Sequence, residues 1–112
     1  MIDATAQNYT FTGGLRSGIW NYTYPSCTLE IDQSCLILRV NIDVPTLKVK
    51  KEYKFLKEEI TKLEIVNGFL FFSRGVRINH TNDSYDKKII FWYWRFGFND
   101  IVDALKKFGW IN

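Results

Sequence analysis

The chain has 112 residues, of which 46% are hydrophobic and 17% aromatic, and its formal net charge is +3. This length predicts one domain with its own core, and the composition is too rich in large apolar residues for a disordered chain. The mild positive charge lacks the clustered basic stripe typical of nucleic-acid-binding domains, so we expect no nucleic-acid partner.

The N-terminal residues are polar and small. They carry neither the basic start nor the apolar centre of a secretion signal, and the longest apolar run, residues 89–94, is far too short to span a membrane. We therefore expect a cytoplasmic protein. Residues 1–16 are expected to form a flexible arm that ends at Gly13-Gly14, and residues 17–112 a single domain.

Strand patterns begin at Ile19 and continue through the first half of the domain. Residues 19–24 are rich in aromatic side chains, and after a break at Pro25-Ser26 we expect a hairpin that pairs 28–31 with 36–42. This register places the two cysteines several residues apart along the ladder. A disulfide needs Cα atoms within about 7 Å, so we expect both thiols to be reduced.

Residues 47–55 alternate between apolar and charged side chains, which predicts a half-buried strand. Lys48, Lys50 and Lys54 would form its outward face. In one interpretation this lysine face binds an anionic membrane surface, where each lysine contributes about 1 kcal/mol. In the other, outward lysines protect an edge strand from aggregation.

Two strands and two turns are expected next. The run ITKLEIV has partly helical spacing, but its β-branched side chains favour a strand over residues 60–66. Asn67-Gly68 predicts a type I′ turn into a strand over 69–73. A second turn at Arg74-Gly75 then leads into the alternating strand 76–80.

The strand predicted over residues 88–95 is unusual because it is apolar on both faces. A strand with one face in water should alternate apolar with polar side chains. In one interpretation the helix covers one face, and either the N-terminal residues Tyr9 and Phe11 or Trp20 cover the other. In the alternative, one face meets a protein partner or a second copy. Tyrosine and tryptophan are enriched at binding hot spots, so Trp92, Trp94 and Trp20 are the candidate interface residues.

One amphipathic helix is predicted over residues 99–108. Asn99 is a favoured N-cap residue, and Ile101, Leu105 and Phe108 form an apolar stripe. Gly109 stands where a left-handed residue ends a helix in a Schellman motif.

Catalytic and metal-binding constellations are not recognisable. His80 is the only histidine, no set of ligands has zinc-site spacing, and no phosphate-binding glycine motif occurs. We expect His80 to be a strand residue beside a polar loop. No catalytic residue, metal or cofactor is predicted, and the protein is expected not to be an enzyme.

The second half of the chain resembles the bacterial pleckstrin-homology-like (PH-like) domains. The resemblance rests on ITKLEI from residue 60, GVRINH from residue 75, IIFWYW from residue 89, and the helix ending in Gly109-Trp110. It implies a mostly β half-open barrel of about seven antiparallel strands in two nearly orthogonal sheets, capped by one C-terminal helix.

The resemblance also implies a non-enzymatic interaction module, which we expect to bind a protein or to self-associate. Some pleckstrin-homology domains bind phosphoinositides through basic residues around the first hairpin, but residues 22–29 carry none here. The alternative function is peripheral binding to an anionic membrane surface through the lysine face, Lys48, Lys50 and Lys54.

Overall fold

Seven strands and one C-terminal helix make up the regular structure of residues 2–43, 45–68 and 72–112, the parts of the chain that the computed structural model describes. The elements are β1 (Tyr9–Ser17), β2 (Trp20–Ile31), β3 (Cys35–Val40), β4 (Glu52–Leu56), β5 (Ile60–Asn67), β6 (Ser73–His80), β7 (Ile89–Trp94) and α1 (Phe98–Lys107). Short 3-10 turns, η1 (Lys57–Glu59) and η3 (Arg95–Gly97), precede β5 and α1.

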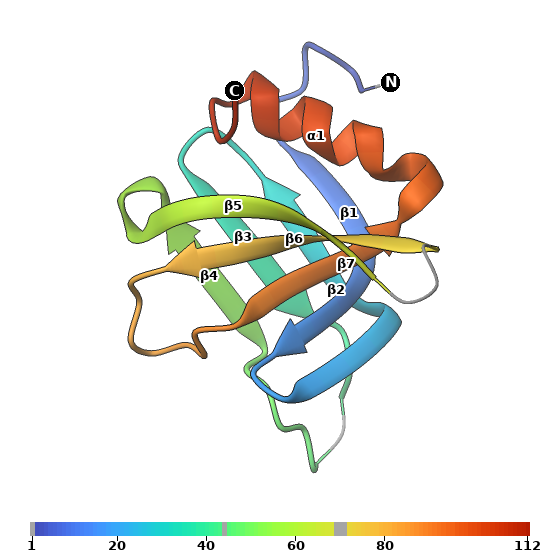
Figure 1. Cartoon of the computed structure of the whole chain (residues 1–112), viewed down its shortest axis with the longest axis vertical. Helices are drawn as coiled ribbons and strands as arrows, with labels where there is room; N and C mark the ends of the chain where they lie inside the picture. Colours follow the sequence, from blue (N-terminus) through green and yellow to red (C-terminus); the bar gives the residue numbers. More distant parts are fainter. Residues whose placement is uncertain (1, 44, 69–71) are drawn as a thin grey trace.

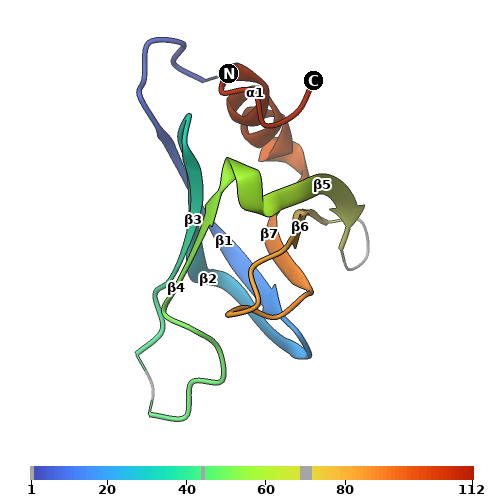
Figure 2. The ribbon, with the colours of Figure 1, turned by 90° about the vertical axis from the view of Figure 1, so that its left-hand side faces the viewer.

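The strands form an antiparallel sheet in the order β4-β3-β2-β1-β7-β6-β5. Figures 1 and 2 show that this sheet curls into a half-barrel, with α1 lying across one end. The predicted half-open barrel with one helical cap is confirmed. Its two halves are continuous, because β1 pairs with both β2 and β7. Among the described residues, no helix is long and apolar enough to cross a membrane.

The first strand is a correction to the sequence prediction. Residues 9–16 were expected in a flexible arm, but they form most of β1, in the middle of the sheet. Gly13 and Gly14 lie at a register shift inside this strand. A methyl group added at Gly13 would lie 1.9 Å from the Trp92 carbonyl oxygen, so these glycines allow close strand contact.

Two strand boundaries in the first half also differ from the prediction. β2 continues through Pro25, but its pairing with β1 is interrupted at residues 23–26, between the pairs Leu15–Tyr22 and Gly13–Cys27, so the irregularity predicted at Pro25-Ser26 is present as a register shift. The strand expected over residues 47–55 begins only at Glu52, where pairing with Arg39 starts. The Val40 N–H, at the end of β3, donates to the Lys51 carbonyl at 2.8 Å, and residues 47–50 lie beyond the end of that strand. β4 is an edge strand, as one of the two interpretations of the lysines required.

The strand over residues 60–66 is confirmed as β5, but the turns after it are wrong. Asn67 pairs with Arg74, and the Gly68 N–H donates to the Ser73 carbonyl at 2.9 Å, so the connection is wider than a two-residue turn. Arg74 and Gly75 lie inside β6. The predicted strand over residues 69–73 falls largely outside the described residues.

The C-terminal helix is confirmed with one change at its start. It begins at Phe98 and follows Gly97, so Asn99 lies in the first turn and is not the N-cap. Phe98 is buried in the core, and this burial fixes the start of the helix. At the other end, Gly109 has a φ of 76° and Trp110 N–H donates to the Leu105 carbonyl at 2.8 Å. The Schellman motif is therefore present.

The predicted hairpin and the reduced cysteines are also confirmed. Cys27 pairs with Val40 across β2 and β3, and both cysteines are free thiols. Burial raises the pKa of Cys27 to about 12. This thiol is a core side chain rather than a reactive one.

Candidate functional site

The two faces of β7 have different surroundings. On the inner face, Ile89 and Phe91 are fully buried in the core. On the outer face, Ile90 is buried, but Trp92 is only half-buried and Trp94 is 56% exposed. The second face of this strand is therefore partly uncovered within the chain.

The residues expected to cover this outer face lie elsewhere. Phe11 contacts the ring of Tyr93, which is on the inner face, with centroids 5.6 Å apart. Trp20 precedes Asn21 on β2, and consecutive strand residues point to opposite faces. Because Asn21 binds Trp92, Trp20 faces away from it. The structure thus brings Trp92 and Trp94 together and separates Trp20 from them.

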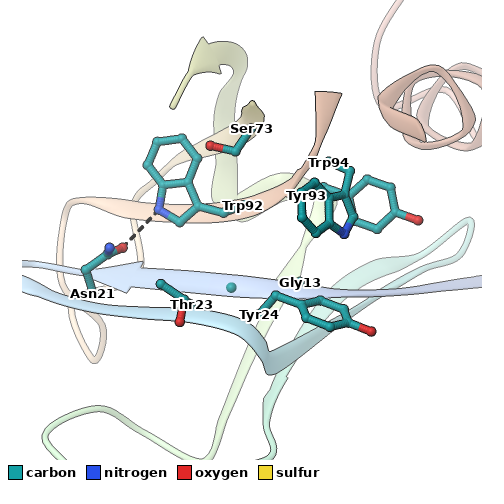
Figure 3. A pocket seen from close by; sticks show the side chains of 9 residues that line it. Gly13, Asn21, Thr23, Tyr24, Ser73, Trp92, Tyr93 and Trp94 are labelled. Atoms are coloured by element: carbon teal, nitrogen blue, oxygen red, sulfur yellow. Dashed lines mark hydrogen bonds between the residues drawn. The ribbon is translucent and has the colours of Figure 1, made fainter. Parts of the chain in front are cut away.

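A pocket of about 270 Å³ opens on the outer face beside these two tryptophans, and we call it the aromatic pocket (Figure 3). Its lining contains no charged side chain and consists of Gly13, Gly14, Asn21, Thr23, Tyr24, Ser73, Trp92, Tyr93 and Trp94. The pocket exists because small residues flank the tryptophans. Gly14 and Gly75 pair with Trp92 from the two neighbouring strands, and Ser73 pairs with Trp94.

The floor of the aromatic pocket is held in one orientation. Trp92 Nε1 donates a hydrogen bond of 3.0 Å to Asn21 Oδ1 (Figure 3). The other edge of the indole lies against Gly75, where an added methyl group would come within 2.8 Å of Trp92 Cε3. A hydrogen bond at one edge and a glycine at the other leave the ring little freedom, so this surface is formed before any ligand binds.

The rim of the pocket carries exposed aromatic rings. Tyr24 is 58% exposed, and its ring centroid lies 6.4 Å from that of Trp94. Phe72 and Phe96 are exposed nearby, and the Arg95 N–H donates to the Phe72 carbonyl at 3.1 Å. Exposed apolar side chains that gather on one part of the surface are typical of interaction sites on soluble proteins.

Sequence reasoning missed half of this site. It identified Trp92 and Trp94 through the two-sided apolar pattern of β7, but it assigned no role to Asn21 or Tyr24. The missed signal was Gly13-Gly14. These glycines lie on β1, between β2 and β7, and because they have no side chains, residues of β2 and β7 can line one pocket above them.

A second pocket, of about 460 Å³, lies between the loop before β4 and the loop before β7, and we call it the loop pocket. Lys48 and Lys50 line it together with Asp83 and Asp86. The predicted lysine face is therefore divided. Lys54 lies on β4, outside this lining, and the other two lysines share their pocket with carboxylates.

A hydrogen-bond chain runs along the base of the loop pocket. Tyr53 Oη donates to Ser17 Oγ at 2.9 Å, and Ser17 Oγ donates to Asp86 Oδ2 at 2.6 Å. The Lys50 N–H donates to Tyr53 Oη at 3.1 Å. Burial, opposed in part by the bond to Ser17, raises the pKa of Tyr53. This chain fastens the two loops to β1.

His80 holds the same loop. The Asn82 N–H donates to His80 Nδ1 at 3.1 Å, so Nε2 carries the proton and donates to the Asp86 carbonyl at 2.8 Å. Both ring nitrogens are thus used within the loop. In residues 2–43, 45–68 and 72–112, no three His, Cys, Asp or Glu side chains gather where they could hold a metal.

Comparisons with known proteins support the fold. No protein-family model matches the chain, and no curated protein matches it. Among solved structures, it is similar to the Vps36 N-terminal PH domain with a TM-score of 0.55 and 11% sequence identity. The match covers 97% of this chain and 83% of that one. The chain therefore has a PH-like fold.

Proposed function

We propose that this protein is a non-enzymatic binding module that holds a segment of another protein in the aromatic pocket. The observation that carries the proposal is the exposed pair Tyr24 and Trp94 above a floor fixed by the Trp92–Asn21 hydrogen bond. Preformed aromatic surfaces bind with a small loss of side-chain freedom. The pocket lining offers no acid, base or nucleophile pair, so its chemistry is recognition.

The size of the aromatic pocket supports a peptide-like occupant. Pockets for whole drug-sized ligands or cofactors span about 300–1,000 Å³. The aromatic pocket, at about 270 Å³, falls just below that range. It fits one or two side chains of a larger partner. The rim of exposed aromatic residues would then contact the rest of the partner segment.

The anionic-membrane alternative has weaker support. Lys48 and Lys50 would have to attract a headgroup from a pocket that also holds Asp83 and Asp86. The carboxylates offset the lysine charges there, and Lys54 lies apart from both lysines.

A peptide-display selection tests the proposal. Random peptides are enriched on the wild-type protein, and their affinities are measured by calorimetry for wild type, Trp94→Ala, Tyr24→Ala and Trp20→Ala. We expect a loss of about tenfold or more with the first two variants. Trp20→Ala, which removes an exposed tryptophan on the other face, should stay within about twofold.

Two outcomes would overturn the proposal. One is a set of enriched peptides whose affinities are the same for wild type and Trp94→Ala. The other is a homodimer in sedimentation equilibrium that Trp94→Ala dissociates, because the pocket would then serve self-association. Circular dichroism and thermal melts confirm that each variant is folded.

A further inference from the structure

The chemistry of the partner segment can be inferred if the aromatic pocket is the binding site, as proposed above. Peptides that add a strand to a sheet need an open edge. Three strands around this pocket, β1, β7 and β6, are interior to the sheet. The fourth, β2, pairs with β3 only over residues 27–31, so its pocket-lining residues Asn21, Thr23 and Tyr24 lie on a stretch without a second partner strand among the described residues. A partner that packs on Trp92 and Trp94, which are carried by the interior strand β7, lies across the outer face of the sheet and not along that stretch of β2.

A helical partner also fits poorly. A helix docks through anchors spaced over several turns in a long apolar groove, and its carbonyls are already bonded internally. The aromatic pocket is short, and its rim offers donors. Tyr24 Oη and Trp94 Nε1 are exposed, and neither makes a hydrogen bond within the part of the chain that the structure describes. These donors suit a segment whose carbonyls are free.

A polyproline II segment meets these conditions. It is extended, it has no internal hydrogen bonds, and its carbonyls are open to donors. Its proline rings are apolar and pack on the faces of tryptophan and tyrosine, which is how aromatic-lined grooves recognise proline-rich peptides. Tyr24 and Trp94 offer two such faces, with centroids 6.4 Å apart.

Charge beside the pocket selects among such segments. Arg16 and Arg77 both pair with Ile90, two positions before Trp92, so they lie on the same outer face. In the described residues, neither guanidinium lies within ion-pair distance of a carboxylate. Glu64 is opposite Arg77 on β5, but it accepts a hydrogen bond from Asn79.

We infer that the aromatic pocket binds an extended, proline-rich segment that carries acidic residues beside its prolines. The prolines pack on Tyr24 and Trp94, and the acidic residues lie toward Arg16 and Arg77. A second copy of this chain is a poorer partner, because two such faces would bring their arginines together. Because Arg16 and Arg77 both lie toward the Ile90 end of the pocket, their charges also give the segment a direction.

Synthetic peptides test the inference by tryptophan fluorescence and calorimetry. The probe is a run of prolines with a glutamate pair at each end. The matched controls replace the glutamates with lysines, or the prolines with alanines. We expect the acidic proline peptide to bind about tenfold more tightly than either control, and to weaken as salt rises.

Protein variants locate the two contacts. Trp94→Ala should weaken both the acidic and the lysine-bearing proline peptides by about tenfold. Arg77→Glu should weaken only the acidic peptide, by several-fold, while Lys106→Glu on α1 should change neither. Melting curves establish that each variant is folded.

The inference fails if the lysine or alanine peptide binds as tightly as the acidic proline peptide, or if none of them binds. This failure is distinguishable from failure of the proposed function. Peptides from the display selection that need Trp94 but contain neither proline nor acidic residues would overturn the inference and leave the binding module intact. Binding to acidic lipid vesicles that needs Trp94, without binding of any peptide, would overturn both.

Discussion

The aromatic pocket and the loop pocket differ in what their side chains do for the fold itself. In the loop pocket, Tyr53 and Asp86 are linked by hydrogen bonds through Ser17, and Lys48 and Lys50 share the lining with Asp83 and Asp86. In the aromatic pocket, Trp92 is hydrogen-bonded to Asn21, while Tyr24 and Trp94 are exposed. The polar residues of the loop pocket therefore have a structural role, whereas the exposed rings of the aromatic pocket have none. Exposure without a folding role is the better sign of binding.

The largest expected effect is a loss of stability on substitution of Gly13, in the lining of the aromatic pocket. Gly13→Ala should destabilise the protein by about 3 kcal/mol, because the new methyl group meets a backbone oxygen that cannot move aside. Urea denaturation measures this change. Gly18→Ala, beside Asp86 of the loop pocket, should cost only about 1 kcal/mol, from its φ of 62°. Equal losses at the two glycines would contradict this difference.

Alkaline pH should destabilise the fold through two buried groups, Cys27 and Tyr53, of which Tyr53 lines the loop pocket. Burial raises the folded-state pKa of Cys27 from 9.0 to about 12, and that of Tyr53 also rises. The unfolded chain therefore loses these protons first, so stability is complete below pH 9 and falls as pH rises toward 12. The slope is about 1.4 kcal/mol per pH unit per group. Denaturation curves from pH 8 to 11 should show it, and Cys27→Val should flatten it; an unchanged slope would refute this origin.

Loss of the hydrogen bond to Trp92 should affect binding more than folding. Asn21→Ala releases the indole, and we expect about 1 kcal/mol weaker binding of the selected peptides. Near-ultraviolet circular dichroism should report a less ordered tryptophan. The matched change Thr23→Ala, also in the lining, should leave that signal unchanged. Unchanged peptide affinity in Asn21→Ala would contradict a role in binding for the Trp92–Asn21 hydrogen bond.

The smallest effect should come from the lysines of the loop pocket. Because Asp83 and Asp86 offset their charge, Lys48→Glu with Lys50→Glu should change binding to acidic vesicles by less than about twofold at low salt. Co-sedimentation with vesicles measures the bound fraction. Strong vesicle binding that this double variant abolishes would instead make the loop pocket the functional site.

Patterns with a short period were predictable from the sequence. The alternation of Val76, Ile78 and His80 gave a correct strand, and all three side chains are buried. The apolar stripe, Gly109 and the Schellman motif identified the helix. The pattern of β7 indicated the candidate site, because tryptophan at two successive outward positions, Trp92 and Trp94, has no explanation in a one-sided strand.

Features that depend on distant residues were not predictable. Gly13-Gly14 indicated a flexible arm, because glycine is typical of loops when its neighbours are unknown. Their role depends on Trp92, far along the chain. Residues 47–50 have the alternation of a strand, but β3 ends too early to pair with them. Local pattern cannot show whether a partner strand is present.

The place of β1 between β2 and β7 has a consequence for how the chain folds. The β1–β2–β3–β4 meander can form from near neighbours in sequence, but the sheet stays open along β1 until β7 reaches it. This closing step joins the first strand to the last and has the highest loop-closure cost in the sheet. Until then β1 presents an unpaired edge, so β7 is expected to dock late, and its aromatic residues then complete the sheet and the aromatic pocket in one step.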